Sequence, residues 1–170
     1  YFSFGFKLLK TPISSSGEDY YVLYSSGPSA DPTFYFFKDG AFKKPAFRLS
    51  AMNVYIPGNG NIYTSGHTNN LFNTRKKFQL KNGELVEAGQ PFYYVGLESK
   101  LLKPAKLYKT RELSEVVATL PAQYPVEVVI NKPGTRLFLL KTNFGLTGWL
   151  EVEDVMYSDQ LIEGLYLAGD

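Results

Sequence analysis

Residues 78–80 and 84–86 are two short apolar segments that flank Asn82-Gly83, and this arrangement predicts a β-hairpin. A two-residue type I′ turn needs positive φ at both central positions, and Asn and Gly adopt such values at low cost. Lysine and glutamine alternate with Phe78 and Leu80, so one face of the hairpin is expected to meet water and the other a core. At this position the chain is therefore expected to form an antiparallel strand pair.

Two further strand pairs are expected on the N-terminal side of this hairpin. Residues 33–37 are expected to pair with Ala41 across a tight turn, and residues 53–56 with residues 62–64 across a loop rich in Asn and Gly. By the spacing of strand and turn signals, residues 18–98 are expected to form a meander of about six or seven antiparallel strands.

The composition agrees with an all-β protein and excludes several classes of function. Thirteen Tyr and thirteen Phe in 170 residues favour strands over disorder. The absence of cysteine excludes disulfides, thiolate metal sites and cysteine nucleophiles. A formal net charge of +2 without a concentrated basic region argues against nucleic-acid binding. No run of eighteen apolar residues occurs, so we expect no membrane span.

The C-terminal third contains a series of short predicted strands that closes on Gly148-Trp149. The strands are expected at residues 105–109, 116–120, 126–130, 137–141 and 147–152. Their order and spacing, with the Gly-Trp-aliphatic closure, resemble the bacterial SH3-like (SH3b) family. The resemblance implies a small β-barrel that binds a ligand and does not catalyse. In its composition, which is rich in Tyr, Asn and Gly, the whole chain also resembles uncharacterised exported proteins of anaerobic gut bacteria.

Residues 111–120 are compatible with two structures. Leu113, Val116, Val117 and Leu120 recur at i, i+3, i+4 and i+7, which is typical of a helix. In the SH3-like arrangement the same stretch is a loop followed by an extended segment at residues 116–120. We expect the extended segment.

The expected architecture is all-β and has two parts with a tail. An antiparallel N-terminal sheet domain, a meander of unknown function, covers residues 1–99, and an SH3-like barrel covers residues 100–157. Residues 158–170 are expected to form a strand or tail that packs back on the body. The connector at residues 100–104 contains two leucines that would be badly placed in water, so the two parts are expected to pack together.

The resemblance implies a ligand groove lined by aromatic side chains of the loops and the last strand. In this chain the rings available to line it are Tyr108, Tyr124, Phe144 and Trp149. A ring offers flat apolar area and, for Tyr and Trp, a polar edge at low entropic cost. Trp149 on a strand is more often a packing residue than a ligand contact, whereas Phe144 at a loop tip fits either role.

Residues that could support catalysis are scarce. His67 is the only histidine, and its polar loop lacks Asp, Glu or Cys, so we expect a solvated side chain and no metal or cofactor. Glu84, Glu87 and Glu98 have a plausible spacing for glycoside hydrolysis, but a chain with sixteen acidic residues contains such groups by chance. The basic residues 75–77 are interpreted as a solvated strand edge.

The leading hypothesis is a non-catalytic binding module of the cell envelope that recognises a cell-wall peptide or glycan, or a partner protein. The chain begins at Tyr1 and not at Met, and we expect an exported protein, in the periplasm or at the cell surface, whose leader has been removed. Two alternatives remain: a carbohydrate-binding protein that uses the N-terminal sheet, where Tyr55 and Tyr63 lie among asparagines, and a structural assembly subunit. Exposed pairs of rings beside Asn would favour the carbohydrate-binding protein, and a large apolar patch would favour the assembly subunit. Two carboxylates facing each other in a cleft would instead favour a hydrolase.

Overall fold

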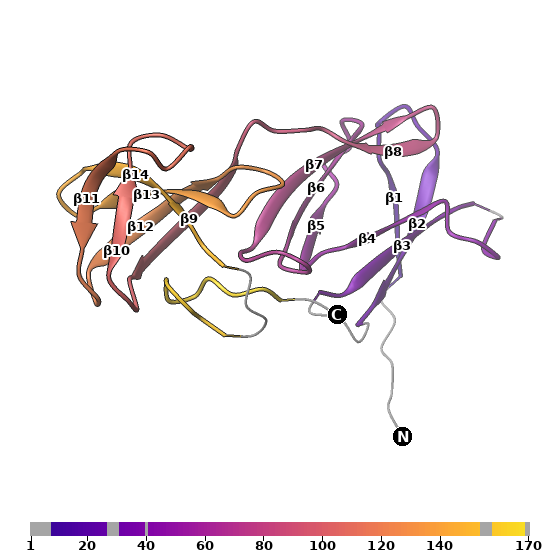
Figure 1. The fold of residues 1–170 in the computed structure, drawn as a ribbon. Helices are drawn as coiled ribbons and strands as arrows, with labels where there is room; N and C mark the ends of the chain where they lie inside the picture. Colours follow the sequence, from indigo (N-terminus) through magenta and orange to yellow (C-terminus); the bar gives the residue numbers. More distant parts are fainter. Residues whose placement is uncertain (1–7, 27–30, 40, 154–157, 169–170) are drawn as a thin grey trace, which may run out of the picture. The chain divides into compact units, whose positions relative to one another are not determined.

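The computed structural model describes residues 8–26, 31–39, 41–153 and 158–168. The described residues form fourteen strands and no helix, and the strands pair in antiparallel sheets, so the expected all-β class is confirmed (Figure 1). The chain divides into two compact units. The first unit extends to Asn69 and includes Arg75–Gly89, and the second comprises Asn70–Thr74 and Gln90–Ala168.

The first unit contains two four-stranded antiparallel sheets. The strands of the first sheet follow the chain in the order β1 (Leu8–Pro12), β2 (Asp19–Ser25), β3 (Thr33–Lys38), β4 (Phe47–Ser50). The strands of the second follow it in the order β5 (Asn53–Tyr55), β6 (Asn61–Gly66), β7 (Thr74–Lys81), β8 (Glu84–Glu87). The side chains that form the buried core of this unit are Ile13, Tyr20, Val22, Phe36, Leu49 and Ile62.

The hairpin at Asn82-Gly83 is confirmed. Lys81 and Glu84 are directly opposite each other in β7 and β8, and the two turn residues between them have φ values of 52° and 82°. Both values lie in the left-handed region that a type I′ turn requires. Local turn chemistry therefore sets this strand pair. The pairing of β5 with β6 is confirmed as well, with Tyr55 opposite Tyr63.

The expected pairing of residues 33–37 with Ala41 is wrong. The Ala41 N–H does donate to the Lys38 carbonyl at 3.1 Å, as in a tight turn, but the next strand begins only at Phe47. Phe36 is fully buried and pairs with Phe47, whose ring stacks on it with centroids 4.6 Å apart. Burial of this ring pair outweighs the local turn signal, because two aromatic rings remove much apolar area from water. Gly40 lies outside the described residues.

The second unit is built on one six-stranded antiparallel sheet. Its strands are β9 (Tyr93–Lys100), β10 (Ala105–Tyr108), β11 (Val116–Leu120), β12 (Pro125–Asn131), β13 (Leu137–Thr142) and β14 (Thr147–Glu151). Their order across the sheet is β11-β10-β14-β13-β12-β9. The last five strands in the chain lie where the sequence predicts them, and residues 116–120 are extended rather than helical.

The expected closed barrel differs from the observed sheet. Among the described residues this sheet is open, with β11 and β9 as its edges. β9 adds a sixth strand by pairing with β12, from Pro125 opposite Lys100 to Asn131 opposite Tyr93. The boundary expected between residues 99 and 100 therefore falls inside a strand of this sheet. Residues 154–157 of the expected barrel lie outside the described part of the chain.

One face of the six-stranded sheet packs into a core of buried aliphatic and aromatic side chains. Phe138, Leu140, Val128 and Leu107 on this face are fully buried. The C-terminal residues add to the same core, since Ile162 is fully buried and forms an isolated bridge with Leu101. The tail thus belongs to the second unit through apolar burial and not through a regular strand.

Gly148 in β14 occupies a position where no side chain fits. A β-carbon at this position would lie 2.6 Å from the Leu107 β-carbon and 3.2 Å from the Tyr108 carbonyl oxygen. Because Leu107 is itself fully buried in β10, it cannot move aside without disturbing the core. The glycine of the Gly-Trp pair therefore permits the close packing of β10 on β14.

We predict that Gly148→Ala destabilises the second unit by about 1 to 3 kcal/mol, because the added methyl group overpacks the core. Denaturant unfolding followed by fluorescence reports on this unit, since Trp149 is the only tryptophan. Gly89→Ala is the matched control, because a β-carbon there meets nothing within 4 Å. Equal unfolding midpoints for the two variants would contradict the role given to Gly148.

Candidate functional site

The face of the six-stranded sheet that points away from the core carries a row of apolar side chains. In the register Tyr108 is opposite Trp149, Trp149 opposite Leu139, Leu139 opposite Ile130, and Ile130 opposite Tyr94. Directly opposite residues of antiparallel strands share a face and lie within about 5.5 Å at their β-carbons. These five side chains, here called the apolar row, cross β10, β14, β13, β12 and β9, and none belongs to the buried core.

Aromatic side chains make further contacts at two points along this row, around Trp149 and around Tyr94. The rings of Phe92 and Trp149 are neighbours, with centroids 6.0 Å apart. Tyr94 is 55% exposed, and its ring lies over Gly96, where any side chain would collide with it. The structure thus brings the predicted site residues Tyr108 and Trp149 together. Trp149 is half-buried among its strand neighbours and leaves part of its indole at the surface.

Of the other two predicted site residues, Phe144 lies in the turn between β13 and β14, and Tyr124, which precedes β12 and packs partly against the core, reaches this turn with its hydroxyl. The Tyr124 hydroxyl is within hydrogen-bond distance of Asn143 Oδ1, at 2.7 Å. Phe144 follows Asn143 and is 84% exposed. The turn is closed by the Gly145 N–H, which donates to the Thr142 carbonyl, and Gly145 has a φ of 97°. A ring exposed to this degree on a well-bonded turn is typical of a contact residue.

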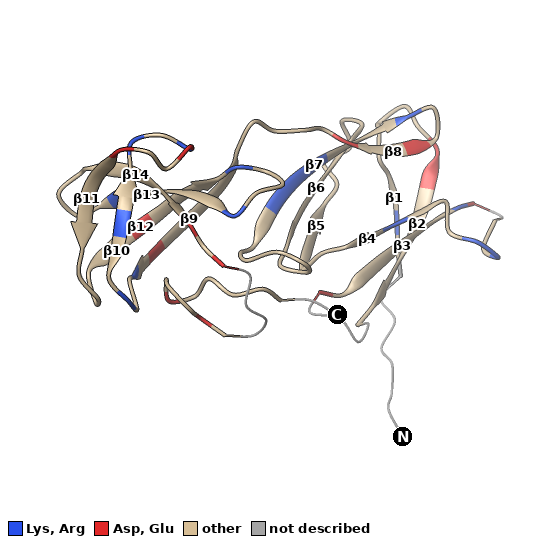
Figure 2. Cartoon of the chain, in the orientation of Figure 1, with Lys and Arg blue, Asp and Glu red and all other residues tan. Residues whose placement is uncertain are grey.

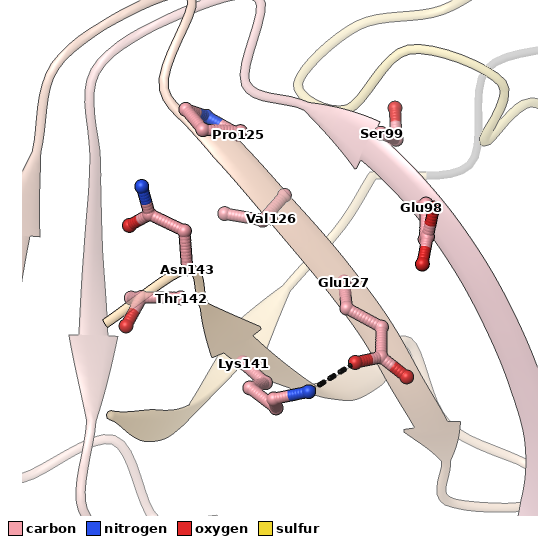
Figure 3. A pocket seen from close by; sticks show the side chains of 8 residues that line it. All are labelled: Glu98, Ser99, Pro125, Val126, Glu127, Lys141, Thr142 and Asn143. Carbon is pink, nitrogen blue, oxygen red and sulfur yellow. Dashed lines mark hydrogen bonds and ion pairs between the residues drawn. The ribbon is translucent and has the colours of Figure 1, made fainter. Parts of the chain in front are cut away.

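A depression of about 260 Å³ lies on the second unit beside this turn. Its lining residues are Glu98, Ser99, Pro125, Val126, Glu127, Lys141, Thr142 and Asn143 (Figure 3). The volume is just below the roughly 300 Å³ at which pockets for whole small ligands begin. The depression can therefore take a side chain or one sugar-sized group of a larger ligand.

Charged side chains form a second row next to the apolar row. Lys141 is opposite Glu127, and Glu127 is opposite Glu98, so we call these three the charged row. Lys141 Nζ donates to Glu127 Oε2 at 2.7 Å (Figure 3). This hydrogen bond and the charge of Glu127 raise the pKa of Lys141 above its ordinary value, so the ammonium group remains charged throughout the neutral range. The Glu98 carboxylate makes no hydrogen bond or ion pair within the described residues.

The four predicted site residues do not form one cluster. Trp149 is opposite Leu139, and Asn143 follows Leu139 by four residues, which is roughly 13 Å at the rise of an extended strand. The charged row lies between these two positions. The surface therefore consists of an apolar row, a charged row with a depression, and an exposed ring at the turn.

Sequence reasoning missed the partners that complete this surface, namely Tyr94, Ile130 and Leu139. The alternation of polarity in β13, where Leu137, Leu139 and Lys141 follow one another at every second residue, indicates which residues share its outer face. It does not indicate which residues of β12 and β14 stand beside them. That information comes only from the cross-strand register.

Asp31 is a buried carboxylate in the first unit that binds the loop around His67. It is 1% exposed, and its Oδ2 accepts the backbone N–H groups of His67 at 2.6 Å and Thr68 at 2.8 Å. The Asp31 N–H in turn donates to Thr68 Oγ1 at 3.1 Å. A side chain on Gly66 would collide with this carboxylate. The loop is thus shaped by a buried carboxylate that sequence analysis did not single out.

Comparison of the chain with known protein families, with characterised proteins and with solved structures finds no match. Within the described ranges, no group of three or more His, Cys, Asp and Glu residues could hold a metal ion. Nor does the described part of the chain contain a helix that is long and apolar enough to cross a membrane.

We predict that Asp31→Ala destabilises the first unit by about 2 to 4 kcal/mol, because the part-buried N–H groups of His67 and Thr68 lose the side-chain oxygen that accepts them both. Amide hydrogen exchange measured by NMR should show faster exchange at His67 and Thr68. Asp39→Ala is the matched control, since the Asp39 side chain is 66% exposed. Unchanged protection of both amides in Asp31→Ala would contradict this assignment.

Proposed function

We propose that this protein is a non-catalytic binding module of the cell envelope, and that it holds a cell-wall peptide or glycan on the outer face of its six-stranded sheet. The observation that carries the proposal is the apolar row, which places Trp149 between Tyr108 and Leu139 on the face opposite the core. Soluble proteins rarely leave a contiguous apolar strip on a sheet face without a partner. Trp and Tyr are also the residues that most often dominate binding energy.

The strand arrangement supports a relation to bacterial SH3-like domains. β10 to β14 occupy the positions expected for the strands of such a domain, and the chain ends this series with Gly148-Trp149. The packing of Leu107 against Gly148 supplies a physical reason for the glycine. The open edge and the added β9 distinguish this sheet from a closed barrel.

The chemistry of the surface suits an extended ligand with both apolar and charged groups. The apolar row can receive the flat face of a sugar or an aliphatic side chain. Lys141 offers a cation, and the Glu98 carboxylate, which makes no hydrogen bond or ion pair in the described structure, offers an anion close to it. A cell-wall peptide carries ammonium and carboxylate groups close together, so it can use both. An extended peptide of about four residues spans the roughly 13 Å from Leu139, opposite Trp149, to Asn143, which precedes Phe144.

The same geometry argues against hydrolysis. Glu98 and Glu127 are direct neighbours beside the depression, which is the paired arrangement that hydrolysis of a glycosidic bond would use. One member of such a pair must remain protonated to act as an acid. The Glu127 carboxylate already accepts a hydrogen bond from the ammonium group of Lys141 at 2.7 Å, so it is engaged in an ion pair. The pair is better suited to binding a cation than to transferring a proton.

We predict that Trp149→Ala lowers binding to insoluble peptidoglycan, stripped of attached anionic polymers, by at least about tenfold, because it removes the central ring of the apolar row. Retention of the protein on the insoluble wall measures this effect, and circular dichroism confirms that the variant folds. Val86→Ala, a change at an exposed residue of the first unit, is the control and should bind normally. Phe144→Ala tests whether the ligand reaches the turn and should cause a smaller loss.

Three results would overturn parts of this proposal. Failure of the unmodified protein to bind peptidoglycan or soluble wall peptides would exclude a wall ligand and leave a protein partner as the better hypothesis. Normal binding by folded Trp149→Ala would exclude the apolar row as the site. Release of wall fragments during incubation, lost in Glu98→Gln, would replace the binding function with a hydrolytic one.

A further inference from the structure

We propose that the first unit carries a second, independent binding surface that holds a polysaccharide containing uronic acids. The surface is the outer face of the sheet β5 to β8 around Tyr55 and Tyr63, and we call it the tyrosine face. It lies on a different sheet from the apolar row and in a different unit. The proposal therefore stands whether or not the second unit binds the cell wall.

Two exposed rings form the centre of this face. Tyr55 and Tyr63 are directly opposite each other in the register of β5 and β6. Their exposed fractions are 59% and 37%, while Ile62 and Thr64 on the other side of β6 are buried. Exposed tyrosines at adjacent positions on two strands present flat apolar area and hydroxyl groups together, which suits the face of a pyranose ring.

Polar groups lie directly beside the rings. Asn53 and Ser65 are the next pair on the same face, two residues along each strand, and Asn53 Nδ2 donates to Ser65 Oγ at 3.2 Å. This bond leaves the amide oxygen and one amide hydrogen of Asn53 available for a ligand. A sugar hydroxyl is both a donor and an acceptor, so it can bind to both groups.

The next strand of the sheet adds positive charge to this face. β7 lies beside β6, and its residues Phe78 and Leu80 pack against the core. Because side chains alternate along a strand, Arg75, Lys77 and Lys81 lie on the opposite, outer face. Figure 2 shows the basic residues of β7 in blue.

Two neighbouring lysines have an acidic residue close by. Lys76 points to the other side of β7 and forms an ion pair with Glu87 at 3.2 Å. Lys81 on the outer face stands opposite Glu84 across the hairpin. Lys77 makes no ion pair within the described residues and is the cation best placed to receive an anion.

The spacing of the strands favours a carboxylate attached to the sugar ring itself. Neighbouring strands lie about 4.8 Å apart, so a cation on β7 is one strand away from a ring that rests on Tyr63 of β6. In a uronic acid the carboxylate is bonded to the pyranose ring, which places it within that distance. A neutral glycan would leave Lys77 without an anion to bind. Single-stranded nucleic acid needs a longer basic groove and more stacking rings than this face provides.

The test is affinity electrophoresis of the purified protein in gels that contain polygalacturonate, its methyl-esterified form, or single-stranded DNA. We expect polygalacturonate to retard the protein, and the retardation to weaken with added salt because an ionic contact is involved. The double variant Tyr55→Ala/Tyr63→Ala should raise the apparent Kd at least about tenfold by removing both stacking rings. Lys77→Gln should raise it about threefold to tenfold by removing one charge contact.

Matched controls separate this surface from general charge and ring effects. Lys43→Gln removes one exposed cation elsewhere in the first unit, and Phe42→Ala removes one ring that is 52% exposed. Both should bind polygalacturonate as the unmodified protein does, and circular dichroism should show that every variant is folded.

Four outcomes would overturn the proposal. These are the absence of retardation by polygalacturonate, equal retardation by the methyl-esterified polymer, normal binding by the folded tyrosine variant, and an equal loss in Lys43→Gln. Tighter binding of DNA through the same tyrosines would instead identify a nucleic-acid surface. The polymer contains no peptide, so failure of the unmodified protein to bind the cell wall and failure of this test are distinguishable.

Discussion

The close packing of β10 on β14 is the constraint on which the second unit depends. Gly148 has no side chain, so the fully buried Leu107 can occupy the space beside it. This contact sets Tyr108 opposite Trp149 on the outer face. Because Gly148 lacks a side chain, Leu107 packs into the core and Tyr108 lies beside Trp149 at the surface. A change at Gly148 is therefore expected to affect both the core and the ring pair.

Because side chains alternate between the two faces of a strand, each unit has aromatic rings both in its core and at its surface. In the first unit Phe36 and Phe47 stack in the interior, while Tyr55 and Tyr63 remain at the surface. In the second unit Phe138 is buried, and Trp149 is on the opposite face of the sheet. A chain rich in rings can thus build its cores and still leave aromatic surfaces available for ligands.

Some elements were predictable because their determinants are local. Asn82-Gly83 specifies its hairpin through two positive φ values that few other residues adopt cheaply. The strand at residues 137–142 follows from a short apolar segment, whereas the extended segment at residues 116–120 was expected from the SH3-like resemblance against a helical periodicity. By contrast, the pairing of residues 33–37 with Ala41 failed, because burial of Phe36 against Phe47 is a long-range effect that no turn residue encodes.

The sequence by itself determined the all-β class, the turn at Asn82-Gly83 and the place of Gly148-Trp149 in the last strand of the C-terminal series. Only the tertiary structure decided that β9 joins the C-terminal strands, that the sheet is open, and that Trp149 lies beside Tyr108. The physical reason is that turns and alternation act over a few residues. Cross-strand register, in contrast, results from many distant contacts that must all be satisfied together.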